Sequence, residues 1–248
     1  YEMLRSLVGS EMCIRDSIFM RKKQNIFRKR QTIGLSILAL IAISVVFSMP
    51  DFWKIPKNNN SSNQNINQSL DVLSSLEVKG RAPKTGYSRD QYGKGWAKDS
   101  SGCDTRNRIL KRDLTNIVEN SDCKIISGTL NDPYTGKTID FSRKQNASAI
   151  QIDHVVALSD AWQKGAQQLS KEKRIEIAND PLNLLAVDGP ANQQKGDSDA
   201  ASWLPSNKNF RCTYVKRQID VKKKYSLWIT QAEKNAIQDV LSLSLIHI

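Results

Sequence analysis

A charge-free apolar segment near the start of the chain sets the first limit on what can fold. Ile33–Met49 contains 17 residues without a charged side chain and follows Arg21–Arg30, which holds six Lys and Arg. As a helix it would be about 26 Å long, slightly less than the roughly 30 Å hydrocarbon core of a bilayer. The pattern is typical of a signal peptide or an N-terminal membrane anchor, which we assign to residues 20–50. No small-residue cleavage site is clear after it, so both alternatives stay open.

Three other segments lie outside the expected domain. Residues 1–19 and 242–248 read like translated sequencing adapters, and we exclude them from fold prediction as non-native. Residues 51–79 are expected to be a flexible linker, because residues 57–69 (KNNNSSNQNINQS) hold hardly any apolar side chain that could offset the entropy of ordering. Export would make the remainder secreted, or anchored on the outer face of a bacterial cytoplasmic membrane.

Residues 80–241 are expected to form one domain of the α+β class. Residues 104–118 space their apolar side chains as a helix does, with Asp104 suited to the N-cap. Residues 123–129 and 137–141 predict a hairpin about the turn NDPYTG. Two more strands are predicted at 149–158 and 182–187, and further helices at 159–168, 171–178, 191–195, 211–225 and 230–241.

Positive charge favours a polyanionic partner for this domain. From Gly80 onward there are 26 Lys and Arg against 19 Asp and Glu, a balance of +7 within the chain's +12. Such a surface suits nucleic acid, although a solvated basic surface explains the charge equally well.

The side chains best suited to catalysis fall in three short motifs. Asp153 and His154 are adjacent at a predicted strand end, Asn183 begins NLL, and Asn192 and Lys195 belong to NQQKGD. Neighbouring residues on a strand point to opposite sides. We therefore expect the backbone to leave the ladder at Asp153 and His154 so that both can serve one site.

These motifs resemble the HNH nuclease superfamily with its ββα-metal fold. More specifically, the chain resembles the C-terminal domain of GmrSD-type restriction endonucleases over nearly all of 81–241, in the motifs GYSRDQYGKGW, GCDTRN, DPYTGK, IDHVVALSDAW, ANDPLNLLAV, NQQKGD and RCTYV. The resemblance implies an HNH ββα-metal core with additional flanking helices and the hairpin. It also implies a metal-dependent endonuclease that hydrolyses phosphodiester bonds.

The resemblance assigns a role to each motif residue. His154 matches the general base, for which a neutral imidazole is suited at pH 7. Asp153 and Asn192 match metal ligands, and Asn183 matches the residue that braces the loop of the catalytic histidine. Oxygen ligands without cysteine fit Mg²⁺, with Mn²⁺ as the alternative.

Two cations are candidates for phosphate contacts. Lys195 is chosen from its place in NxxK, and Arg106 from CDTR, where an ion pair with Asp104 or Asp113 is the competing role. Tyr87, Arg89 and Trp96 are expected at the edge of the site, although aromatic packing explains the tyrosine and the tryptophan equally well.

Three cysteines fall inside the predicted domain, in a context where disulfides persist. Cys103 and Cys123 are the nearest pair and would close a loop of about 20 residues, which leaves Cys212 outside that pair. A metal cluster is the competing interpretation, but no CxxC spacing supports it.

The prediction is therefore an exported endonuclease of low sequence specificity that acts on DNA, with RNA as a further substrate, and that we expect to be a monomer. The alternative is a surface module that binds or takes up DNA without cleaving it. That alternative uses the basic charge but gives no reason for a histidine beside Asp153.

Overall fold

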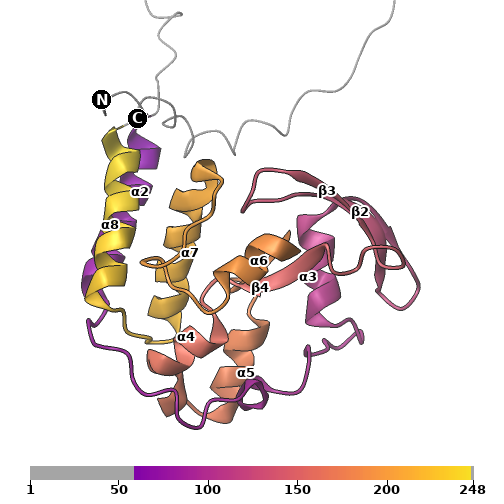
Figure 1. Ribbon diagram of the computed structural model, residues 1–248, viewed down its shortest axis with the longest axis horizontal. Helices are drawn as coiled ribbons and strands as arrows, with labels where there is room; N and C mark the ends of the chain where they lie inside the picture. The colour runs from indigo at the N-terminus through magenta and orange to yellow at the C-terminus, as the bar shows by residue number, and fades with distance from the viewer. Residues whose placement is uncertain (1–58, 247–248) are drawn as a thin grey trace, which may run out of the picture.

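The computed structural model describes residues 59–246, which combine helices with two small antiparallel sheets, so the predicted α+β class is confirmed (Figure 1). The helices are α2 (Asn59–Ser75), α3 (Thr105–Asp113), α4 (Leu158–Gln163), α5 (Lys171–Asn179), α6 (Gly189–Lys195), α7 (Arg211–Lys224) and α8 (Gln231–Ile246). Short 3-10 helices are η2 (Arg89–Tyr92), η3 (Ala166–Gln168) and η4 (Lys208–Phe210). The strands are β1 (Thr115–Glu119), β2 (Ile125–Asn131), β3 (Thr138–Ser142), β4 (Ile150–His154) and β5 (Leu184–Asp188).

The three-stranded sheet contains the predicted hairpin. β2 and β3 pair in a continuous antiparallel register, with Leu130 opposite Ile139. In the connecting turn, the Asp132 carboxylate accepts hydrogen bonds from the backbone N–H and the hydroxyl of Thr135. Aspartate is favoured in turns because its side chain bonds the backbone two or three residues on.

The helix predicted over 104–118 is shorter than expected. Asp104 does cap α3, since its side chain accepts from Asn107 N, but the helix ends at Asp113. The next residues form β1, whose Thr115 pairs with Thr129 of β2. Thr, Ile and Val are β-branched and fit a pleated strand better than a helix, so sheet pairing overrides the helical spacing here.

The two-stranded sheet β4–β5 lies at the centre of the fold and is followed directly by α6 (Figure 1). Its register is regular to the end, with Asp153 opposite Leu185 and His154 opposite Leu184. The backbone does not leave the ladder at this point, contrary to the expectation from the motif. Asp188 ends β5 and caps α6 by accepting from Ala191 N.

Part of the segment expected to be a flexible linker is helical. α2 lies against α8 at one side of the molecule (Figure 1), and its Ile66 and Leu73 are each only 2% exposed. These residues are seven apart and share a helical face, which buries against α7 and α8. The linker prediction is therefore wrong from Asn59 onward, because tertiary packing supplies the stabilisation that the polar composition lacks. Residues 51–58 lie outside the described part.

The C-terminal helix also extends beyond its predicted end. α8 continues from Leu241, which is buried, to Ile246, whereas the sequence prediction stopped the domain at residue 241. The segment 242–248, predicted to be non-native, therefore overlaps α8 at 242–246. Residues 1–19, 20–50 and 247–248 lie outside the described residues, and within 59–246 no helix combines the length and apolarity needed to cross a bilayer.

Cys103 and Cys123 form the disulfide that their proximity in sequence suggested. It joins the residue before the α3 cap to the turn between β1 and β2. Cys212 of α7 is 5% exposed and packs in the hydrophobic core that this helix shares with α2 and α8.

Candidate active site

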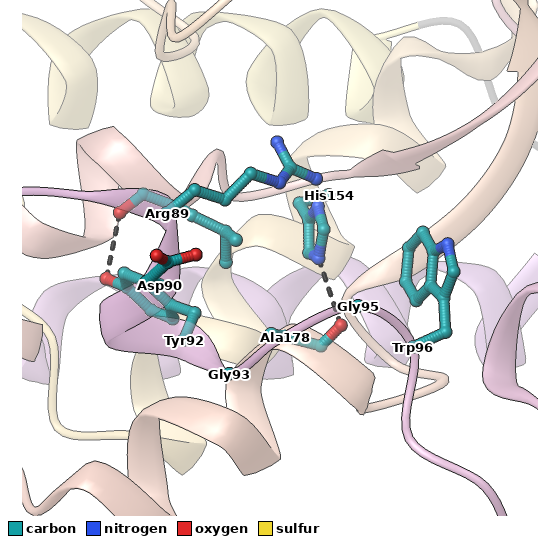
Figure 2. A pocket seen from close by; sticks show the side chains of 9 residues that line it. Arg89, Asp90, Tyr92, Gly93, Gly95, Trp96, His154 and Ala178 are labelled. Carbon is teal, nitrogen blue, oxygen red and sulfur yellow. Dashed lines mark hydrogen bonds between the residues drawn. The ribbon is translucent and has the colours of Figure 1, made fainter.

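A cavity of about 170 Å³ opens beside the end of β4 (Figure 2). It is lined by residues from η2, the following loop, β4 and the helices α4 and α5: Arg89, Asp90, Tyr92, Gly93, Gly95, Trp96, His154, Leu158 and Ala178. Arg89 and Trp96, which the sequence analysis expected at the edge of the site, both line this cavity. Tyr87 does not line the cavity and instead packs edge-on against Tyr92 and Trp162.

The outer wall of the cavity is held in place by η2. Tyr92 is 2% exposed and its hydroxyl donates to Leu158 O at 2.8 Å. Arg174 of α5 donates to the backbone and the side chain of Gln91. The chain then turns at Gly93, whose φ of 95° is a conformation that glycine adopts without strain. This turn brings Trp96 back over the end of β4.

His154 forms the inner wall and its ring is fixed on two sides. The imidazole stacks on the Trp96 indole, with centroids 5.7 Å apart and planes within 9°. Its Nε2 lies 3.0 Å from Ala178 O. A carbonyl oxygen can only accept a hydrogen bond, so Nε2 must carry the proton. In the neutral ring Nδ1 therefore has the free lone pair, and this nitrogen is available as a base.

The surroundings keep this imidazole uncharged. Burial lowers the pKa of His154 to about 3, and the nearby charges of Arg89 and Lys195 act in the same direction. The hydrogen bond to Ala178 O opposes the shift. His154 is thus in the proton-accepting form throughout the neutral range.

Asn183 holds the segment that follows His154. Its side-chain oxygen accepts from Val156 N at 2.8 Å, and its amide donates to Val156 O and Ile177 O. Its own backbone oxygen accepts from Val155 N. These contacts join β4, α5 and the start of β5, and they are the contacts that a residue bracing the His154 segment would make.

Asp153 points to the other face of β4, away from the cavity. Its Oδ1 accepts from Lys195 Nζ at 3.0 Å and its Oδ2 from the Tyr134 hydroxyl. Burial raises the pKa of this carboxyl, while the Lys195 ammonium and the Tyr134 hydroxyl oppose that rise. Asp153 and His154 are adjacent in sequence but belong to two different environments.

The remaining predicted site residues do not line the cavity. Lys195 is 1% exposed and donates to Asp153 and to His154 O, so its ammonium does not face solvent. Asn192, one turn earlier on α6, donates to Gln151 Oε1. Arg106 donates to Ile150 O, at the opposite end of β4 from His154. His154 is four positions further along the strand than Ile150, which corresponds to about 13 Å.

Whether a divalent cation fits at the predicted ligands depends on which of their oxygens are free to bind it. Asp153 and Asn192 both face the interface between β4 and α6, but both Asp153 oxygens already accept hydrogen bonds, one of them from an ammonium. Across residues 59–246 there is no group of three or more His, Cys, Asp and Glu side chains arranged to hold a metal ion. In this arrangement the predicted ligands do not fit a divalent cation.

Sequence reasoning did not assign a role to Tyr134 or to the carbonyl of Ala178. Tyr134 lies in the DPYTGK motif and is fully buried next to Asp153, so its motif carried the signal. A backbone carbonyl has no signature in the sequence, and only the fold places Ala178 O against His154.

Comparison with known proteins assigns this chain to a protein family. The family model of GmrSD restriction endonucleases, C-terminal domain, matches residues 104–240, and the chain belongs to this family. The domain is therefore of nuclease type.

A relative from Arthroderma benhamiae, described as an uncharacterized secreted protein, is 38% identical over 209 residues. The match covers 84% of this chain and 98% of that protein. No solved structure matches this chain.

Proposed function

We propose that this protein is an endonuclease that hydrolyses phosphodiester bonds of DNA with low sequence specificity, using His154 as general base. The observation that carries the proposal is the fixed tautomer of His154, with Nε2 donating to Ala178 O and Nδ1 free beside the cavity. A histidine with only a structural role would have no need of an open cavity at its second nitrogen.

In the proposed reaction Nδ1 accepts a proton from the attacking water. The water oxygen forms a bond to phosphorus, and the bond to the 3′ oxygen breaks with its electron pair on that oxygen. The hydrogen bond from Nε2–H to Ala178 O offsets part of the cost of the imidazolium that forms, since burial disfavours this charge. Stacking on Trp96 limits rotation of the ring, so the base keeps its direction.

The order of elements supports an HNH ββα-metal core. Two antiparallel strands, β4 and β5, are followed directly by α6, and Asp153, His154, Asn183 and Asn192 occupy these elements or their junctions. In this proposal the β2–β3 hairpin and the remaining helices are additions to that core.

A divalent cation, Mg²⁺ with Mn²⁺ as the alternative, belongs to the proposal because the resemblance implies one. Such an ion would supply a positive charge for the phosphate oxygens. The resemblance names Asp153 and Asn192 as its ligands, but as they now lie they do not fit a cation, and they face away from the His154 cavity. A cation at Asp153 would require Lys195 to leave the carboxylate.

Export is proposed from residues 20–50, as a signal peptide or an N-terminal anchor. The description of the Arthroderma benhamiae relative as secreted supports the first alternative. The protein would then act outside the cell, secreted or held at the outer face of the membrane, and we propose that it acts as a monomer.

Supercoiled plasmid is the direct test of this function. Purified protein is incubated with plasmid in Mg²⁺, in Mn²⁺ and in EDTA, beside a His154→Ala variant whose folding is checked by circular dichroism. Cleavage that requires His154 supports the nuclease, and loss of cleavage in EDTA supports the cation. Cleavage by the folded variant at the normal rate would remove His154 from the mechanism.

The second candidate is a surface module that binds or takes up DNA without cleaving it. The excess of Lys and Arg favours it, whereas the cavity beside His154 Nδ1 plays no part in it. Binding without cleavage in every cation, by folded protein, would favour this candidate.

A further inference from the structure

Arg89 differs from every other arginine in residues 59–246. Its guanidinium makes no hydrogen bond or ion pair with the described part of the chain, although its side chain lines the cavity. Each of the others bonds a carboxylate, a carbonyl or another side-chain oxygen: Arg81, Arg106, Arg108, Arg112, Arg143, Arg174, Arg211 and Arg217.

The unpaired guanidinium lies where the free base lies. Figure 2 shows Arg89 extending from η2 with its guanidinium directed toward the side of the His154 ring that faces away from Ala178. Arg89 and His154 line the same cavity. The Asp90 carboxylate lies on the Tyr92 side of the cavity in the same view. A donor fork and a proton acceptor therefore share the His154 end of the cavity.

A phosphodiester is the ligand that satisfies both groups. A guanidinium presents N–H donors in a planar fork that matches two oxygens of a phosphate. Nδ1 of His154 has a lone pair that can accept a proton from a water beside that phosphate. Resting on the nuclease function proposed above, we propose that Arg89 binds the non-bridging oxygens of the scissile phosphate and places phosphorus one water away from His154 Nδ1.

The reaction balances with Arg89 in this role. The water proton passes to Nδ1, the water oxygen bonds to phosphorus, and the 3′ oxygen leaves with its electron pair and takes a proton from solvent. Arg89 exchanges no proton; it offsets the charge that accumulates on the non-bridging oxygens. Lys195, the cation chosen from sequence, is buried against Asp153 and does not reach this cavity.

The test is equilibrium binding of a fluorescently labelled oligodeoxynucleotide in EDTA, so that cleavage does not intervene. Wild type is compared with Arg89→Ala, Arg89→Lys and Asp90→Asn. Lys137→Ala is the charge-matched control, because Lys137 is exposed in the turn between β2 and β3, outside the cavity. Cleavage of plasmid is measured for the same set.

Arg89→Ala should weaken binding about ten- to a hundredfold, since a hydrogen bond to a charged group is lost. It should also reduce the slope of log affinity against log salt by about 1. Arg89→Lys should recover part of the binding but not the cleavage rate, because one ammonium cannot span two oxygens. Lys137→Ala should bind within about twofold of wild type, and Asp90→Asn at least as tightly as wild type.

Wild-type binding and cleavage by folded Arg89→Ala would overturn the role of Arg89 and leave the nuclease intact. Equal losses in Arg89→Ala and Lys137→Ala would also overturn it, since that result describes a diffuse basic surface. Absence of both binding and cleavage in wild type would instead contradict the proposed function itself.

Discussion

Asp153 and His154 are adjacent in sequence, lie on opposite faces of β4 and differ in how completely their side chains are hydrogen-bonded. On one face Asp153 is buried and both of its oxygens are bonded, by Tyr134 and Lys195. On the other face His154 has one nitrogen bonded and one free beside a cavity with an unpaired arginine. A polar group with all its partners inside the protein stabilises the fold, whereas one that lacks a partner beside a cavity is available to a ligand. The comparison is consistent with a stabilising role for Asp153 and with the catalytic role proposed for His154.

On the face of β4 that lines the cavity, His154→Ala should give the largest change. Loss of a general base lowers cleavage about 10²- to 10⁴-fold. The free energy of unfolding should fall by only about 1–3 kcal/mol, for the lost bond to Ala178 O and the lost stack on Trp96. Plasmid nicking and urea unfolding measure the two quantities. A variant that unfolds at once would show that His154 is equally a structural residue, and the contrast with Asp153 would disappear.

Asp153→Ala should act mainly on stability. It leaves the Lys195 ammonium buried without a counter-charge, which costs about 3–5 kcal/mol of unfolding free energy. The pair Asp153→Leu with Lys195→Met should recover most of this loss, because it removes both charges.

The melting temperature in Mg²⁺ tests whether Asp153 also binds a cation. If it does, Mg²⁺ should raise the melting temperature of wild type but not of Asp153→Ala, measured against EDTA. Equal melting temperatures with and without Mg²⁺ in wild type support the ion pair with Lys195 alone.

The free energy of unfolding should also depend on pH through His154, by a smaller amount. The pKa of His154 is about 3 in the folded state, below the roughly 6.5 of an unfolded chain. The unfolded state therefore binds more protons in that window, so the stabilisation is complete above pH 6.5 and is lost as pH falls toward 3. At pH 5 the loss is about 2 kcal/mol. Urea unfolding from pH 7 to 4 should slope less in His154→Gln, and equal slopes would contradict the low pKa.

Asn183→Ala should act on the position of the His154 segment rather than on the chemistry. It removes the acceptor of Val156 N and leaves that buried group unsatisfied, at a cost of about 1–3 kcal/mol in stability. Cleavage should fall less than in His154→Ala, because the Ala178 contact still orients the ring. Asn183→Asp keeps the acceptor but loses the two donated bonds to Val156 O and Ile177 O, so it measures those donor contacts. A loss of cleavage as large as that of His154→Ala would place Asn183 in the chemistry itself.

The order of elements in the domain was predictable because it depends on local patterns. The β2–β3 hairpin follows from alternation around NDPYTG, and the helix cap follows from Asp104. Predictions failed where distant packing overrides local preference. β1 replaces the end of a predicted helix because β2 offers it a pairing edge, and α2 is ordered because Ile66 and Leu73 find a buried face on α7 and α8.

For the site, the sequence by itself identified the family motifs, the adjacent Asp153 and His154, and the two cysteines of the disulfide near α3. Only the tertiary structure decided what each side chain does. Lys195 and Asp153 are 42 residues apart, and the packing of α6 on β4 turns that lysine inward as a counter-charge. The fold of η2 against α5 turns Arg89 toward His154 instead. Alternation along a strand follows from local backbone geometry, but the partner that meets each face comes from distant segments, and no local pattern specifies it.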